Sequence, residues 1–116
     1  MSTLAESPAV DPRIKSIAGE VRRQLSGIYG DRLVRLVLFG SQARGDARPW
    51  SDIDVMLVLR GPVNTEQEAK RTIDAIARLS LNHDCVIMPE FVDQAEFTRG
   101  HSSLVDTVLE EGLEID

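Results

Sequence analysis

The most informative segment of the chain is Phe39-Gly40-Ser41-Gln42-Ala43-Arg44-Gly45, which continues through residues 46–50 into Ser51-Asp52-Ile53-Asp54-Val55. Branched and aliphatic residues dominate 33–39 and 53–59, and such runs predict two mostly buried strands. Gly40-Ser41 ends the first run abruptly, and the polar segment that follows is too long for a tight hairpin. We therefore expect the connection between the two strands to carry the chemistry.

Helices are predicted before, between and after the strands. Asp11-Pro12 is a helix-start signal, because the aspartate can cap free amides and proline is tolerated in the first turn. Thr65 with Glu68 three residues later forms a capping box that opens a second helix. Apolar residues within 104–109 predict a last amphipathic helix, which ends at Gly112.

A third strand is expected over residues 85–92, at an edge or bend of the sheet because it contains Pro89. Residues 113–115 are apolar enough to add a short terminal strand. The resulting order of helix, strand, strand, helix, strand, helix predicts the α/β class, with helices packed on a short sheet.

Length and composition place the chain among ordinary globular proteins. Its 116 residues suit a single domain, which we expect over 11–116, after a flexible polar leader at 1–10. No apolar run approaches the roughly 20 residues of a membrane span, and the N-terminus lacks the pattern of a secretory signal. We therefore expect no membrane association.

Charge and residue usage restrict the partners and the compartment. The net charge of −6 and the five scattered aromatic residues argue against direct nucleic-acid binding, which needs a basic face. Cys85 is the only cysteine, which excludes an internal disulfide and a thiolate zinc cage. A lone thiol suits a reducing compartment, so a cytoplasmic location is expected.

Asp52 and Asp54 are the strongest candidates for metal ligands. They are two residues apart at the start of a strand, so their side chains share one face of the sheet. A divalent cation relieves the repulsion between neighbouring carboxylates. Oxygen ligands without His or Cys favour Mg²⁺ or Mn²⁺.

Gly40 and Ser41 form a candidate phosphate site at the end of the preceding strand. Glycine allows close approach of the backbone, and the serine hydroxyl and the following amides can bind phosphate oxygens. Arg44 lies in the same segment and either meets a phosphate oxygen or forms a surface ion pair. A phosphate site beside a metal site is suited to phosphoryl transfer.

These residues resemble the signature of the minimal nucleotidyltransferases of the DNA polymerase β superfamily. In that signature a Gly-Ser is followed after ten residues by Asp-x-Asp, as Gly40-Ser41 is followed by Asp52-Ile53-Asp54. The resemblance implies a mixed sheet flanked by helices. It also implies a pair of divalent metal ions, and transfer of a nucleotidyl group (AMP from ATP is expected) with release of pyrophosphate.

The resemblance also implies roles for individual residues. Gly40 and Ser41, together with Arg44, would bind the triphosphate, and Asp52 and Asp54 would ligate the metals and take part in catalysis. Family members carry a third metal-binding and catalytic carboxylate on a neighbouring strand. Two residues are candidates for it, with Asp84 preferred to Glu90.

Stand-alone domains of this kind resemble antitoxin-type nucleotidyltransferases that work with a HEPN-domain protein, whose tyrosine hydroxyl would be the acceptor. Two other functions remain open: a degenerate relative that neutralises a partner by contact alone, and a metal-dependent phosphohydrolase. Apolar Phe91, Val92 and Phe97 are either core residues or a contact in a homo-oligomer. The acidic C-terminal residues are interpreted as a solvated face, although a helix end disfavours negative charge; they are Glu110, Glu111, Glu114 and Asp116.

Overall fold

The computed structural model describes residues 1–100 and 102–116 and contains α-helices, one 3₁₀ turn and four strands. In chain order the elements are α1 (Pro12–Tyr29), η1 (Gly30–Arg32), β1 (Leu33–Phe39), α2 (Ser41–Arg44), β2 (Ile53–Leu59), α3 (Thr65–Asn82), β3 (Ile87–Asp93), α4 (Gln94–Arg99), α5 (Ser103–Glu111) and β4 (Leu113–Glu114). All the helices and strands expected from the sequence are present. The short α2 and α4 are additions.

The strands form one mixed sheet in the order β3-β2-β1-β4. β1 pairs antiparallel with both β2 and β4, whereas β2 and β3 are parallel and are connected through α3. Pro89 lies in β3, at the edge of the sheet, as its missing N–H predicts. The α/β class and the mixed sheet are therefore confirmed.

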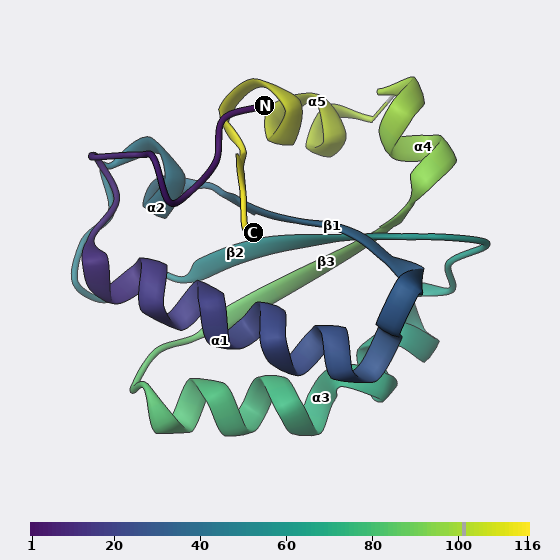
Figure 1. Cartoon of the computed structure of the whole chain (residues 1–116), viewed down its shortest axis with the longest axis horizontal. Helices are drawn as coiled ribbons and strands as arrows, with labels where there is room; N and C mark the ends of the chain where they lie inside the picture. The colour runs from purple at the N-terminus through teal and green to yellow at the C-terminus, as the bar shows by residue number, and fades with distance from the viewer. Residues whose placement is uncertain (101) are drawn as a thin grey trace.

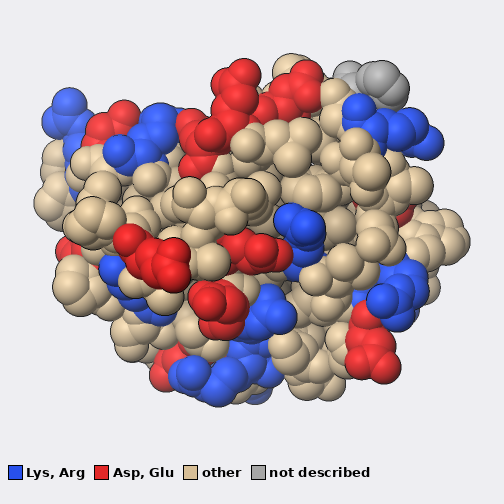
Figure 2. Space-filling view, turned by 45° about the horizontal axis from the view of Figure 1, so that its top comes forward, with Lys and Arg blue, Asp and Glu red and all other residues tan. Residues whose placement is uncertain are grey.

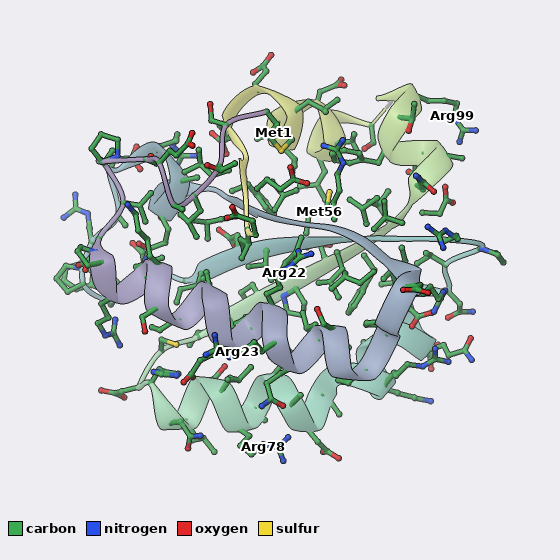
Figure 3. The ribbon with its side chains drawn as sticks, in the orientation of Figure 1. Met1, Arg22, Arg23, Met56, Arg78 and Arg99 are labelled. Atoms are coloured by element: carbon green, nitrogen blue, oxygen red, sulfur yellow. The ribbon has the colours of Figure 1, made fainter. Side chains whose placement is uncertain are left out.

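Helices cover both faces of this sheet: α1 and α3 lie on one side, and α4 and α5 on the other (Figure 1). Alternation along β2 supplies both cores, because Ile53 packs on the α1–α3 side and Met56 on the α5 side. Figure 3 shows Met56 between the sheet and α5. Val92 and Phe97 are buried in the second core, so both are core residues.

The start of α3 differs from the expected capping box. Asn64 is the N-cap, and its side-chain oxygen accepts a hydrogen bond from the N–H of Gln67 at 3.0 Å. Glu68 turns inward instead, with only 2% of its surface exposed. It accepts hydrogen bonds of 2.9 Å each from the Tyr29 hydroxyl and from Arg32 Nη1. The Glu68 carboxylate therefore bonds to Tyr29 and Arg32, which are distant in the sequence, instead of capping the start of α3 as local rules predict.

Two of the first ten residues are buried against the domain, although the polarity of this segment predicts a loose leader. Leu4 and Val10 are buried in the first core. The Leu4 N–H donates to the Glu114 carbonyl at 2.9 Å, and Thr3 forms a bridge with the same residue. Two apolar side chains and an edge of β4 are enough to attach this segment.

Within residues 1–100 and 102–116, no helix combines the length and apolarity that crossing a membrane requires. On the face shown in Figure 2, acidic and basic side chains are interspersed and the basic ones form no continuous track.

Candidate active site

The Gly40-Ser41 turn lies directly against the start of β2. The β1–β2 register places Phe39 opposite Asp54, so the next residue, Gly40, lies beside the aspartate. Gly40 has φ 77° and ψ −158°, a conformation that is essentially restricted to glycine. A Cβ at Gly40 would overlap Asp54 Oδ2 and lie 3.3 Å from its Cγ. Glycine is therefore required both for the backbone shape and for the close approach of the carboxylate.

Asp52 lies close enough to Asp54 to affect the ionisation of Asp54. Asp52 is exposed just before β2, and Asp54 is half-buried as its second residue. Burial raises the pKa of Asp54, and the negative charge of Asp52 raises it further. A divalent cation would relieve both effects, since it replaces lost solvation and screens the like charges. This pair of oxygen ligands fits Mg²⁺ or Mn²⁺.

Arg44 ends the short α2 and reaches back over the turn. Its Nε donates to Asp46 Oδ2 at 3.2 Å, and its Nη1 donates to both oxygens of Glu111 at 3.0 and 3.1 Å. The positive charge of Arg44 also lowers the pKa of Asp54, against the larger raising effects. Arg44 is therefore an ion-pair residue located beside the candidate metal pair.

The two candidates for a third carboxylate lie in different surroundings. Asp84 precedes β3 with φ 49° and lines a cavity of about 240 Å³ with Arg13, Trp50 and Ile53. The side chain of Ile53 points to the opposite face of β2 from Asp54. Glu90 pairs with Met56 in the parallel register and therefore shares the face of Asp54.

Met88 is the residue of β3 directly opposite Asp54, and 45% of its surface is exposed. The strand next to the aspartate pair therefore has a thioether where a carboxylate would face Asp54 most directly. Among the described residues, no cluster of three or more His, Cys, Asp and Glu side chains is arranged to hold a metal.

Glu111 is part of this site, although sequence reasoning assigned it to a solvated face. Its Oε1 accepts a hydrogen bond from the Gly40 N–H at 3.0 Å, in addition to the ion pair with Arg44. In the sequence, this role is indicated only by the position of Glu111 at a helix C-terminus, where the helix dipole disfavours an acidic residue. A tertiary partner explains that placement.

Comparison with known proteins identifies the family. A family model of the nucleotidyltransferase domain matches residues 14–115. The chain belongs to this family. It is 34% identical over 102 residues to "Putative protein adenylyltransferase MJ0141" from Methanocaldococcus jannaschii, covering 88% of this chain and 98% of that one. A second protein of the same organism, "Putative protein adenylyltransferase MJ0604", is 35% identical over 89 residues, or 76% of this chain and 83% of the relative. The enzyme class implied by the resemblance to the nucleotidyltransferases is confirmed.

Solved structures share the nucleotidyltransferase fold. The crystal structure of "a putative nucleotidyltransferase from Sulfolobus solfataricus" superposes with a TM-score of 0.62 at 21% identity, covering 88% of this chain and 78% of that one. A toxin–antitoxin structure with AMP-PNP gives 0.61 at 19% identity, with coverage of 85% and 72%. A complex of tri-AMPylated Shewanella oneidensis HEPN toxin with MNT antitoxin gives 0.56 at 16% identity, with coverage of 89% and 71%. The expected likeness to the MNT antitoxins is confirmed at the level of fold.

Proposed function

We propose that this nucleotidyltransferase transfers AMP from ATP to a hydroxyl group of a partner protein, with a divalent cation held by Asp52 and Asp54. One observation carries the proposal: the Gly40 turn and the Asp54 carboxylate are in direct contact. A triphosphate bound at Gly40, Ser41 and Arg44 would therefore lie beside the acidic pair.

Two groups of residues have separate roles in the proposed reaction. Gly40, Ser41 and Arg44 bind and orient the triphosphate, and Asp52 and Asp54 hold the cation. When bound, Mg²⁺ or Mn²⁺ neutralises charge on the phosphates and on the leaving pyrophosphate.

The acceptor oxygen forms a bond to the α-phosphorus while the bond from that phosphorus to the α–β bridging oxygen breaks, and pyrophosphate leaves. The hydroxyl proton passes to a carboxylate. We assign this role to Glu90 rather than Asp84, because Glu90 shares the face of Asp54.

The choice of nucleotide and acceptor is supported by the relatives. Two relatives at least 34% identical carry the name "Putative protein adenylyltransferase". A structure of the same fold was determined with AMP-PNP, and another contains an AMPylated HEPN toxin. We extend these properties to this chain as a proposal that it modifies a HEPN-type partner, whose tyrosine hydroxyl is the candidate acceptor.

The test measures Mg²⁺-dependent ATP binding by calorimetry, and AMP attachment to a HEPN-domain protein by intact-mass spectrometry. The wild type is compared with an Asp52→Asn, Asp54→Asn double variant and with Asp74→Asn, which changes an exposed aspartate on α3 in the same way. We expect the double variant to lose both signals and Asp74→Asn to retain them. ATP turnover that releases phosphate rather than pyrophosphate would instead indicate a phosphohydrolase.

A contact-only antitoxin is the second candidate, and the exposed Met88 opposite Asp54 is the observation that favours it. The same double variant separates the two functions. Neutralisation of the partner that persists without Asp52 and Asp54 would support masking by contact, whereas its loss with the complex intact would support catalysis.

A further inference from the structure

Glu111 brings a carboxylate from the end of α5 onto the two groups that the proposed reaction needs for phosphate binding. Its Oε1 accepts from the Gly40 N–H at 3.0 Å, and both of its oxygens accept from Arg44 Nη1. Only 18% of the Glu111 side chain is exposed. Hydrogen bonds in which one or both partners are charged are stronger than those between neutral groups.

The fold locates Glu111 through its neighbours in β4. The β1–β4 register pairs Leu38 with Leu113, and continuing it by two residues brings Glu111 opposite Gly40. Gly112, which lies between Glu111 and Leu113 in the sequence, packs so closely on β1 that an added Cβ would lie 2.6 Å from Val37 Cγ1. Glu111 is therefore held over the Gly-Ser turn by the sheet itself.

We propose that Glu111 is a positioning residue for nucleotidyl transfer: it holds the Gly40 turn and the Arg44 guanidinium in the geometry that receives the triphosphate. This role rests on the proposed function. Glycine adopts the conformation of Gly40 without strain but is free to leave it for many others, and the hydrogen bond from the Gly40 N–H to Glu111 holds the turn in this one conformation.

The geometry of Arg44 favours positioning over competition with the nucleotide. A guanidinium carries five N–H donors. Here Nε is bound by Asp46 and Nη1 by Glu111, and no hydrogen bond within the described chain involves Nη2. The two carboxylates thus fix the plane of the guanidinium and leave one nitrogen for a phosphate oxygen. Pre-organisation of this kind lowers the entropy cost of binding.

The experiment compares Glu111→Ala and Glu111→Gln with Glu110→Ala, which removes a neighbouring, exposed charge from the same helix. Calorimetry gives the affinity for Mg²⁺–ATP, steady-state pyrophosphate release gives KM and kcat, and hydrogen exchange follows the Gly40 amide. In Glu111→Ala we expect affinity to fall about tenfold and Gly40 exchange to rise about tenfold, as loss of one charged hydrogen bond implies. KM should rise more than kcat falls.

Glu111→Gln keeps an oxygen acceptor for the Gly40 N–H, so it should recover most of the affinity. Glu110→Ala should match the wild type. Tighter ATP binding by Glu111→Ala would overturn the proposal, because it would mean that the carboxylate competes with phosphate. Unchanged binding and exchange would overturn it as well.

Failure of the proposed function gives a different result. A wild-type protein that binds no Mg²⁺–ATP refutes nucleotidyl transfer, and with it any effect of Glu111 on ATP binding. Gly40 exchange then decides separately whether Glu111 holds the turn, and exchange as slow in Glu111→Ala as in the wild type overturns that part too.

Discussion

Replacing Gly40 with alanine tests the contact on which the proposed site depends. Gly40 and Gly61 both have positive φ, 77° and 85°, but an added Cβ meets nothing within 4 Å at Gly61 and overlaps the Asp54 carboxylate at Gly40. Gly61→Ala is therefore a matched control: it carries the backbone cost of a left-handed conformation without the steric conflict.

The two substitutions should differ in magnitude for this reason. A non-glycine residue in the left-handed region costs about 1–2 kcal/mol, which is the loss expected for Gly61→Ala. Gly40→Ala adds the further strain of a glycine-only conformation and the displacement of Asp54. Its free energy of unfolding should fall by about 3–5 kcal/mol in total.

Urea unfolding followed by far-ultraviolet circular dichroism measures both losses, and calorimetry measures Mg²⁺–ATP binding by the folded variants. We expect Gly40→Ala to lose ATP binding, because the carboxylate has to move, and Gly61→Ala to retain it. A Gly40→Ala protein as stable as Gly61→Ala, or one that binds ATP like the wild type, would refute the argument that this close approach builds the site.

Further predictions concern stability. Because burial and Asp52 raise the pKa of Asp54, ionisation of Asp54 opposes folding, and this cost develops as the pH rises from the pKa of an ordinary carboxyl group to the raised pKa of the folded state. Asp54→Asn should therefore raise the free energy of unfolding at pH 7, by less than about 1 kcal/mol because solvent screens a half-buried carboxylate. The gain should disappear below the pKa of an ordinary carboxyl group, as urea titrations at several pH values will show. Added Mg²⁺ should raise the melting temperature of the wild type and leave that of Asp54→Asn unchanged, unless the aspartate pair binds no cation. Glu68→Ala should cost about 3–5 kcal/mol, because it leaves Arg32 without its buried partner. Tyr29→Phe, which removes one hydrogen bond to the same carboxylate, should cost about 1–3 kcal/mol, and equal losses in the two variants would contradict this account of the network.

Local patterns predicted the secondary structure well where neighbours along the chain decide it. The aliphatic runs became β1 and β2, and Asp11 caps α1 through a hydrogen bond to the Arg13 N–H. The capping box at Thr65 was wrong because Glu68 finds a better partner in Tyr29, 39 residues away. Local rules cannot anticipate such a choice, since they compare only nearby acceptors.

The candidate site, too, could be predicted from the sequence only in part. Its two central parts, the Gly-Ser turn and the aspartate pair, were visible because each lies within a few residues and the strand register brings them together. The surroundings of Asp84 depend on which face of the sheet its loop approaches. Its cavity includes Ile53 and neither Asp52 nor Asp54, which no spacing along the chain could indicate.

The order of helices and strands and the chemistry of the Gly-Ser and Asp-x-Asp segments could be predicted without coordinates, because hydrophobic periodicity and turn residues act over short distances. That Glu111 reaches Gly40 and Arg44, 71 and 67 residues away, follows only from the folded arrangement of the chain. The same is true of the burial of Leu4 and Val10 in the core. These contacts depend on the pairing of β4 with β1, and strand pairing between distant segments is settled by the burial of the whole sheet rather than by any single stretch of sequence.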